Sequence, residues 1–217
     1  MLEAFTWYRQ SAYRYEGDGL TVYIDPWGVP DGVPPGDVIF LTHAHADHFS
    51  PDDFEKVRSE KSTIVAPRDV ANDCGLTGTI VPVAPGDTID AGGIKAEAVP
   101  AYNIVEDRLD KHPKENNWVG YILSLGDASY YFAGDTDHVP ELSSLKAQVA
   151  FVPIGGTYTM DVDEAAGLIR EIRPTIAVPN HYGYIVGTPA DADRFKASCD
   201  PIEVELMEPQ NPFEKTS

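Results

Sequence analysis

Short hydrophobic runs bounded by glycine, proline or aspartate recur along the chain, a pattern typical of β-strands. Residues 5–15 and 20–25 are rich in aromatic and β-branched residues and flank a polar turn at residues 16–19, so they predict an opening β-hairpin. The run at residues 38–41 is apolar throughout and indicates a buried strand. Further strands are expected at residues 63–66, 80–83, 94–100, 118–125, 130–133, 149–154, 175–179 and 202–207.

Capping residues and helical spacing predict helices between these strands. Ser50 is followed by proline and two acidic residues, which is typical of a helix N-terminus. Asp161 is expected to cap a helix that ends at Ile172, because apolar residues recur there at helical spacing. Shorter helices are expected at residues 51–58, 68–74, 140–146 and 189–197. The chain is therefore predicted to be β-rich with interposed helices.

The length and composition favour one domain. A chain of 217 residues can bury a substantial core, and its 18 glycines and 18 prolines are spread between the apolar runs, so we expect a single domain over residues 1–217. The N-terminal segment lacks a basic stretch followed by an apolar one, and no long uncharged apolar run occurs. We therefore expect a soluble protein that has no membrane partner.

Charge and cysteine content restrict the partners and the compartment. The formal net charge of -19, from 35 acidic against 16 basic residues, would repel a polyanion, which disfavours nucleic acid as a partner. An acid-rich surface is also an adaptation to high salt, and the sequence leaves both explanations open. Cys74 and Cys199 are far apart and lack a partner motif, so a disulfide framework is not expected and a reducing cytoplasm fits best.

The densest group of chemically active residues follows the buried strand at residues 38–41. His43, His45, Asp47 and His48 lie within six positions, and they include three of the 6 histidines of the chain. A single histidine after a strand is more often hydrogen-bonded or solvated than metal-bound, but imidazole and carboxylate at this density are the ligands that Zn²⁺ and similar ions prefer. The turn is therefore predicted to hold metal.

Two other strands are followed by a candidate ligand in the same manner. Asp135 follows the strand at residues 130–133, and His181 follows the strand at residues 175–179. Each alone could be a turn former or a hydrogen-bonded residue at a strand end. The repetition predicts that these strand ends converge on one metal site.

The pattern His-x-His-x-Asp-His after a buried strand resembles the signature of the metallo-β-lactamase superfamily. The resemblance implies an α/β fold, a four-layer αββα sandwich of two mixed β-sheets flanked by helices. It also implies one or two divalent metal ions at one edge, with Zn expected and Mn or Fe as alternatives. At the matching positions, the first metal would be held by His43 and His45, the second by Asp47, His48 and His181, and both by Asp135. In the superfamily an Asp-Pro pair at the position of Asp25-Pro26 shapes the floor of the site. An equal alternative is that this pair only forms a turn.

One ligand of the first metal departs from the resembled pattern. Relatives similar to the ascorbate-phosphate lactonase group carry Pro-Ala-x-His where this chain has Pro100-Ala101-Tyr102-Asn103. Asparagine is a weak zinc ligand, so we expect His112, in the long polar loop at residues 101–117, to replace the missing histidine. The alternative is that His112 is a solvated loop residue. His138 is expected near the site or on the surface.

The resemblance implies hydrolysis by a hydroxide held between two metal ions, with Asp135 as the bridging carboxylate and Asp47 orienting the attacking water. Oxygen-reducing diiron relatives usually have Glu in place of His45, so hydrolysis is favoured over redox chemistry. Four residues are candidates for binding a phosphate or carboxylate of the substrate: Lys111, Lys114, Tyr158 and Tyr182. The alternative is that the lysines are ordinary surface residues and the tyrosines pack in the interior.

The sequence thus predicts a metal-dependent hydrolase of a small ester, lactone or phosphoester. The loop at residues 155–160 resembles a subgroup of uncharacterised small metal-dependent hydrolases, but resemblance at this level does not fix a substrate. Two alternatives remain: a metal-binding module without turnover, which the departure at Asn103 motivates, and a nuclease of the same superfamily. A homo-oligomer is compatible with the sequence.

Overall fold

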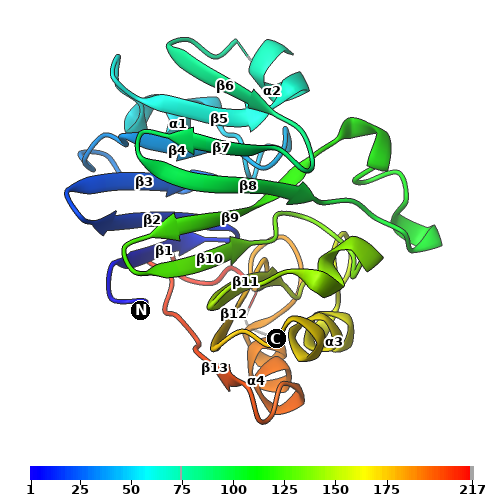
Figure 1. Cartoon of the computed structure of the whole chain (residues 1–217). Helices are drawn as coiled ribbons and strands as arrows, with labels where there is room; N and C mark the ends of the chain where they lie inside the picture. The colour runs from blue at the N-terminus through cyan, green and yellow to red at the C-terminus, as the bar shows by residue number, and fades with distance from the viewer. Residues whose placement is uncertain (74, 216–217) are drawn as a thin grey trace.

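Two mixed β-sheets pack face to face at the centre of the molecule (Figure 1). The computed structural model describes residues 1–73 and 75–215. The first sheet has the order β1-β2-β3-β4-β5-β6, antiparallel from β1 to β3 and parallel from β3 to β6. Its strands are β1 (Phe5–Arg9), β2 (Ala12–Gly17), β3 (Leu20–Ile24), β4 (Val38–Phe40), β5 (Thr63–Pro67) and β6 (Thr79–Val83).

The second sheet has the order β13-β12-β11-β10-β9-β8-β7. It is antiparallel from β7 to β10 and parallel from β10 to β13. Its strands are β7 (Thr88–Ala91), β8 (Ile94–Pro100), β9 (Val119–Leu125), β10 (Ala128–Phe132), β11 (Val149–Pro153), β12 (Ile176–Asn180) and β13 (Glu203–Val204).

Helices cover the outer face of each sheet, which confirms the predicted αββα sandwich. Helices α1 (Pro51–Val57) and α2 (Arg68–Asp73) pack on the first sheet, and α3 (Val162–Ile172) and α4 (Pro189–Ser198) pack beside the second. Short 3₁₀ turns are η1 (Glu106–Arg108), η2 (Lys114–Asn116) and η3 (Pro140–Ser144).

Strand β4 shows why this sequence has an uninterrupted apolar run. Val38 and Phe40 point into the core between the two sheets, whereas Ile39 and Leu41 pack in the cluster that includes Phe54 of α1. Successive side chains of a strand point to opposite faces, so a strand covered on both faces needs apolar residues at every position. The run therefore places β4 in the interior, with its carboxyl end fixed by packing.

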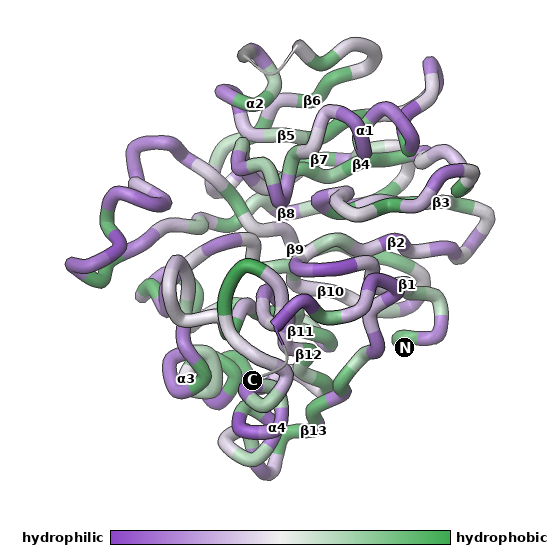
Figure 2. The backbone as a smooth tube through the Cα atoms, turned by 180° about the vertical axis from the view of Figure 1, so that it is seen from behind, coloured by the Kyte–Doolittle hydropathy of each residue, from purple (hydrophilic) through white to green (hydrophobic). Residues whose placement is uncertain are grey.

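The loop between β8 and β9 is the segment that departs most from regular structure. Figure 2 shows it projecting from the body of the molecule, with a largely hydrophilic chain. It contains η1 and η2 and returns to the sheet at Trp118. The expectation of a long polar loop over residues 101–117 is therefore confirmed.

Some element boundaries differ from the predictions. The expected first strand at residues 5–15 is two strands, because the chain reverses at Gln10, whose φ is 49°. The expected helix at residues 140–146 is the 3₁₀ turn η3, and the expected strand at residues 202–207 is only β13. The predicted end of the second helix at Cys74 lies outside the described residues.

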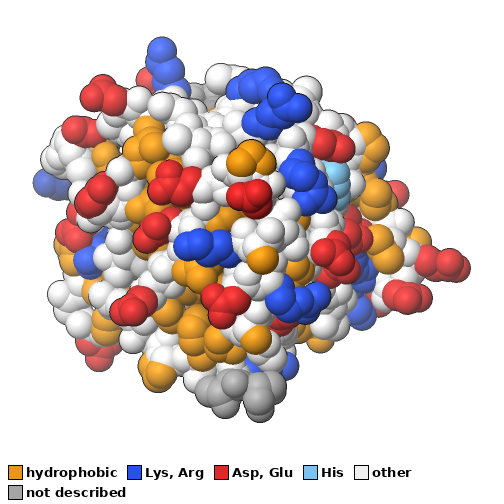
Figure 3. Space-filling model, turned by 90° about the horizontal axis from the view of Figure 1, so that it is seen from below, with side chains coloured by type: hydrophobic (Ala, Val, Ile, Leu, Met, Phe, Trp, Pro, Cys, Tyr) orange, Lys and Arg blue, Asp and Glu red, His pale blue; other side chains and the backbone are white. Residues whose placement is uncertain are grey.

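Charged side chains are distributed over the surface. Figure 3 shows acidic side chains interspersed with lysine, arginine and hydrophobic groups on the face seen from below. No helix within residues 1–73 and 75–215 has the length and apolarity needed to cross a bilayer.

Candidate metal centre

Three strands end directly before predicted ligands, and His112 comes from the loop between β8 and β9. β10, β11 and β12 are parallel, so the carboxyl ends of β10 and β12 lie at the same edge of the second sheet. The carboxyl end of β4, in the first sheet, leads into the histidine-rich turn that completes the site. The ligands that follow β4, β10 and β12 are His43, Asp135 and His181, respectively.

A tight turn after β4 directs neighbouring side chains to different places. The carbonyl of His45 accepts hydrogen bonds from the backbone N–H of His48 at 2.9 Å and of Phe49 at 2.8 Å. Ala44 and Ala46 lie on the exposed side of this turn, whereas His43 and His48 are buried. The small spacers thus allow one short segment to supply ligands to two positions.

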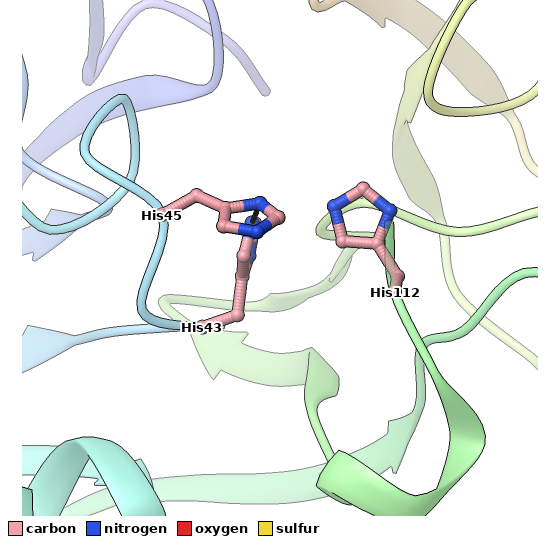
Figure 4. A group of neighbouring side chains, drawn as sticks. All are labelled: His43, His45 and His112. Atoms are coloured by element: carbon pink, nitrogen blue, oxygen red, sulfur yellow. Dashed lines mark hydrogen bonds between the residues drawn. The ribbon is translucent and has the colours of Figure 1, made fainter. Parts of the chain in front are cut away.

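The first group of ligand atoms comes from His43, His45 and His112, and these atoms lie within 4.8 Å of one another. Nε2 of His43 is 3.1 Å from Nδ1 of His45. Figure 4 shows the ring of His112 directed toward the other two from the opposite side. The structure therefore brings the loop histidine to the place where a third ligand is missing from the resembled pattern.

The second group comes from Asp47, His48 and His181, again with ligand atoms within 4.8 Å. Nε2 of His181 is 3.4 Å from Asp47 Oδ2, and Nε2 of His48 is 3.6 Å from the same oxygen. The two groups are connected by Asp135, which lies 3.1 Å from His48 Nε2, 3.0 Å from His181 Nε2 and 3.3 Å from His112 Nε2. Asp135 thus lies within 3.3 Å of ligand atoms from both groups.

The residues present fit divalent metal ions. Four candidate ligand atoms are buried and have no hydrogen-bond partner among the described residues: Nε2 of His48, His112 and His181 and Oδ1 of Asp135. Leaving one such buried polar atom unsatisfied costs about 1–3 kcal/mol, so four at one point need an explanation. Each of the three nitrogens lies within 3.3 Å of an oxygen of the Asp135 carboxylate. Imidazole nitrogen with carboxylate oxygen is the ligand set of borderline divalent ions.

In three of the histidines, His43, His48 and His112, the other ring nitrogen lies within hydrogen-bond distance of a neighbouring oxygen. Nδ1 of His48 is 2.7 Å from Asp25 Oδ2, and Nδ1 of His43 is 3.0 Å from Thr42 Oγ1. A carboxylate at Nδ1 keeps the proton on that nitrogen and leaves the Nε2 lone pair free for a metal ion. Asp25 therefore orients His48.

This contact of Asp25 with His48 was not predicted from the sequence. The available signal was that Asp25 follows β3, which is parallel to β4, so both strand ends lie at one edge. A contact of Gln10 was not predicted either: its Nε2 donates a hydrogen bond to Asp47 Oδ2 at 3.3 Å. Gln10 reaches the site because of the unexpected chain reversal between β1 and β2.

The electrostatics of the site combine burial with close opposite charges. Burial, followed by the neighbouring charge of His48, holds the pKa of His43 well below its usual range. Burial also acts to lower the pKa of His181, but the carboxylates of Asp135 and Asp47 together outweigh it and raise this pKa to about 9. Burial acts to raise the pKa of Asp47, but His48 and His181 outweigh it and lower this pKa to about 2. The buried carboxylates thus require positive charge beside them.

A pocket of about 290 Å³ opens above the ligands. It is lined by His45, Ala46, Asp47, Lys111, His112, Asp135, Tyr158, His181 and Ile185. Lys111 and Tyr158, two of the predicted substrate-binding residues, are in this lining. Nζ of Lys111 is 2.9 Å from Asp110 Oδ2.

The other two predicted substrate-binding residues do not line this pocket. Nζ of Lys114 is 2.9 Å from Glu141 Oε1 and 3.0 Å from the hydroxyl of Tyr102, in a separate hollow. Tyr182 is buried, and its ring packs against Trp7 and Phe213. His138 lies near the surface, with Nε2 3.0 Å from Glu171 Oε2.

An αββα sandwich with histidine and aspartate ligands converging at one edge defines a class of metal-binding proteins with an open pocket above the ligands. A family model described as the β-lactamase superfamily domain matches residues 4–181. The chain belongs to the metallo-β-lactamase superfamily, as the histidine pattern predicted.

Several relatives share most of the chain. A UPF0173 metal-dependent hydrolase of Methanopyrus kandleri is 31% identical over 97% of this chain and 99% of its own length. A solved structure from Parabacteroides distasonis, described as a metal-dependent hydrolase, has a TM-score of 0.85 and 31% identity, and the match covers 95% of this chain and 93% of that one. The metallo hydrolase Igni18 of Ignicoccus hospitalis has a TM-score of 0.76 and 25% identity, over 95% of each chain.

Proposed function

We propose that this protein is a hydrolase that uses two divalent metal ions to cleave a small molecule. The observation that carries the proposal is that one buried carboxylate, Asp135, lies within 3.3 Å of His112 in the first group and of His48 and His181 in the second. The names of the relatives as metal-dependent hydrolases agree with it. When bound, the ions supply a nucleophilic hydroxide at neutral pH and polarise the bond that is cleaved.

The side chains of the site have separate tasks in this proposal. The first ion is bound by His43, His45 and His112. The second ion is bound by Asp47, His48 and His181, and Asp135 binds both ions. We propose zinc because nitrogen ligands dominate the set, with Mn or Fe as alternatives. Asp47 also lines the pocket, and Gln10 donates to its Oδ2, so this carboxylate is held where it could orient a water molecule toward the substrate.

The pocket suggests the kind of substrate. The cation in its lining, Lys111, is paired with Asp110, whereas Ile185 is 40% exposed in the same lining. Apart from Met1, the exposed large hydrophobic side chains of the described residues lie on the loops that supply His112 and His181: Ile104, Val105, Leu109 and Ile185. Burial of an apolar substrate group against such side chains is favourable. We therefore propose an ester, lactone or phosphoester with an apolar group beside the cleaved bond.

A small substrate is preferred over nucleic acid for two reasons. A pocket of about 290 Å³ is at the lower limit for a small-molecule site. The formal net charge of -19 opposes the approach of a polyanion.

The test is hydrolysis by protein prepared with and without metal. Metal-free protein is reconstituted with Zn²⁺, Mn²⁺ or Fe²⁺ and assayed on neutral esters, lactones and phosphodiesters that carry alkyl or aryl groups. We expect turnover that depends on added metal and is abolished in Asp135→Ala. Activity that persists in metal-free protein would contradict the proposal, and metal-loaded protein inert on the entire panel would favour a binding module without turnover.

A further inference from the structure

The loop between β8 and β9 supplies His112, although loops are usually less rigid than the strand ends that supply the other ligands. A ligand must be held in one orientation to bind a metal ion well. His112 is nevertheless buried, with an exposed fraction of 1%. The structure must therefore contain groups that fix this residue.

Asn103 contacts His112 through both backbone and side chain. Its Oδ1 is 2.8 Å from Nδ1 of the His112 ring and accepts the backbone N–H of His112 at 3.1 Å. The backbone N–H of Asn103 also donates to the carbonyl of His112 at 2.9 Å. These contacts join the two ends of the loop segment and hold the imidazole against the amide.

The direction of the Asn103 amide follows from its other partners. Its Nδ2 donates to Asp137 Oδ1 at 2.9 Å and to the carbonyl of Tyr158 at 3.0 Å. Both partners are acceptors, so the amide nitrogen must face them and the oxygen must face His112. An oxygen at this place requires a proton on Nδ1 of His112, which leaves the Nε2 lone pair directed toward Asp135, 3.3 Å away.

A buried ion pair anchors this arrangement to helix α3. Asp137 Oδ2 accepts the backbone N–H groups of Ile104 and Val105 at 2.7 and 2.9 Å. Nε of Arg108 lies 2.5 Å from Asp137 Oδ1. The Arg108 guanidinium also donates to Glu164 Oε2 at 2.7 Å, on the first turn of α3.

We infer that Asn103 is a positioning residue for the first metal site, which fixes the ring orientation and tautomer of His112 and is itself held by Asp137 and Arg108. The inference rests on the proposed metal centre. It also explains the departure in the sequence, because the residue at the position of the expected histidine contacts the ligand that replaces it.

The direct test is the metal affinity of Asn103→Leu, which removes the acceptor but keeps the number and branching of the side-chain heavy atoms. Zn²⁺ binding is titrated against a competing chelator, with Trp118 fluorescence as a local signal. The Trp118 ring lies 4.9, 5.0 and 5.8 Å from the rings of His43, His45 and His112, so it reports on the first site. Loss of a hydrogen-bond partner of a ligand costs about 10–100-fold in metal affinity, so we expect a loss of this size at the first site only.

Two matched variants separate positioning from folding. Asn103→Asp keeps an oxygen acceptor for His112 but places a carboxylate against Asp137, so it should lower the thermal stability of metal-free protein and retain most of the first-site affinity. Asn116→Leu is the control, since Asn116 lies on η2 in the same loop and is not buried. Equal losses of affinity in Asn103→Leu and Asn103→Asp, or none in either, would overturn the inference.

A measurement on the unaltered protein decides the matter if Asn103→Leu does not fold. Nitrogen-15 NMR of the histidine rings in metal-free protein reports which nitrogen of His112 carries a proton. A proton on Nδ1 is expected, and an unprotonated Nδ1 would refute the inference. Failure of hydrolysis would contradict the proposed function but leave this tautomer and the metal affinities as separate results.

Discussion

Replacing Gly155 with alanine would place a methyl group against the backbone of His181. Gly155 follows β11, and a Cβ atom there would lie 2.5 Å from the carbonyl oxygen of His181 and 2.4 Å from Cγ2 of Val186. Ordinary contacts of a Cβ atom are 3.4–4 Å, so these groups would have to move by about 1 Å. Gly155 does not have a positive φ, so the effect is steric and does not arise from backbone strain.

The size of the effect follows from this overlap. Overpacking of this kind costs about 1–3 kcal/mol in the free energy of unfolding. In a chain of this length each kcal/mol shifts Tm by about 2–4 °C, so we expect Tm of Gly155→Ala to fall by about 2–12 °C. Since His181 must move, metal binding at the second site should weaken as well.

The assay is differential scanning calorimetry of metal-free protein together with Zn²⁺ titration. The control is Gly167→Ala in α3, where the added Cβ would meet the His138 ring at 3.5 and 3.7 Å, which is ordinary contact. Alanine replaces glycine within a helix there, which should stabilise the protein by about 0.5–1 kcal/mol. If Gly155→Ala keeps both the Tm and the Zn²⁺ affinity of the unaltered protein, the reasoning about the placement of His181 is refuted.

Three further predictions concern the metal and the substrate. Asp25→Asn removes the carboxylate at His48 Nδ1, so Zn²⁺ affinity at the second site should fall by about 10–100-fold while the Trp118 signal of the first site is unchanged. A loss of Zn²⁺ affinity at the first site instead would argue against the assignment of His48 to the second site. Removal of metal by a chelator should lower Tm, since a ligand at 1,000 times its Kd stabilises the folded state by about 4 kcal/mol. An unchanged Tm in calorimetry would mean that no ion binds preferentially to the folded protein. Inhibition of the metal-loaded enzyme by n-alkyl hydroxamates should strengthen as the alkyl chain of the inhibitor lengthens, and Ile185→Ser should reduce this dependence without changing the metal content. Inhibitor affinity that is independent of alkyl chain length would exclude an apolar substrate group.

The sequence predicted those parts of the fold that local pattern determines. The apolar run of β4 and the candidate ligands after β4, β10 and β12 indicated where the side chains would gather. The carboxyl ends of the parallel strands β10 and β12 lie at a common edge, and the turn after β4 in the other sheet meets them there. The capping residue Asp161 was predicted correctly for the same reason, since a cap depends on neighbours in the chain.

Features that depend on side-chain direction or on long-range contacts were not predictable. Spacing gave no indication that Lys114 would pair with Glu141 or that Tyr182 would pack against Trp7 instead of facing the pocket. The contact of Asn103 with His112 also joins residues separated by most of a loop, and no periodic pattern marks such a pair.

X-ray diffraction at the absorption edge of the bound metal, on crystals of the metal-loaded protein, tests whether the ligands hold two ions. The account predicts two anomalous peaks on either side of Asp135, one contacted by His43, His45 and His112 and the other by Asp47, His48 and His181. The absence of either peak from this edge of the sheets, or a first ion that His112 does not contact, would contradict it.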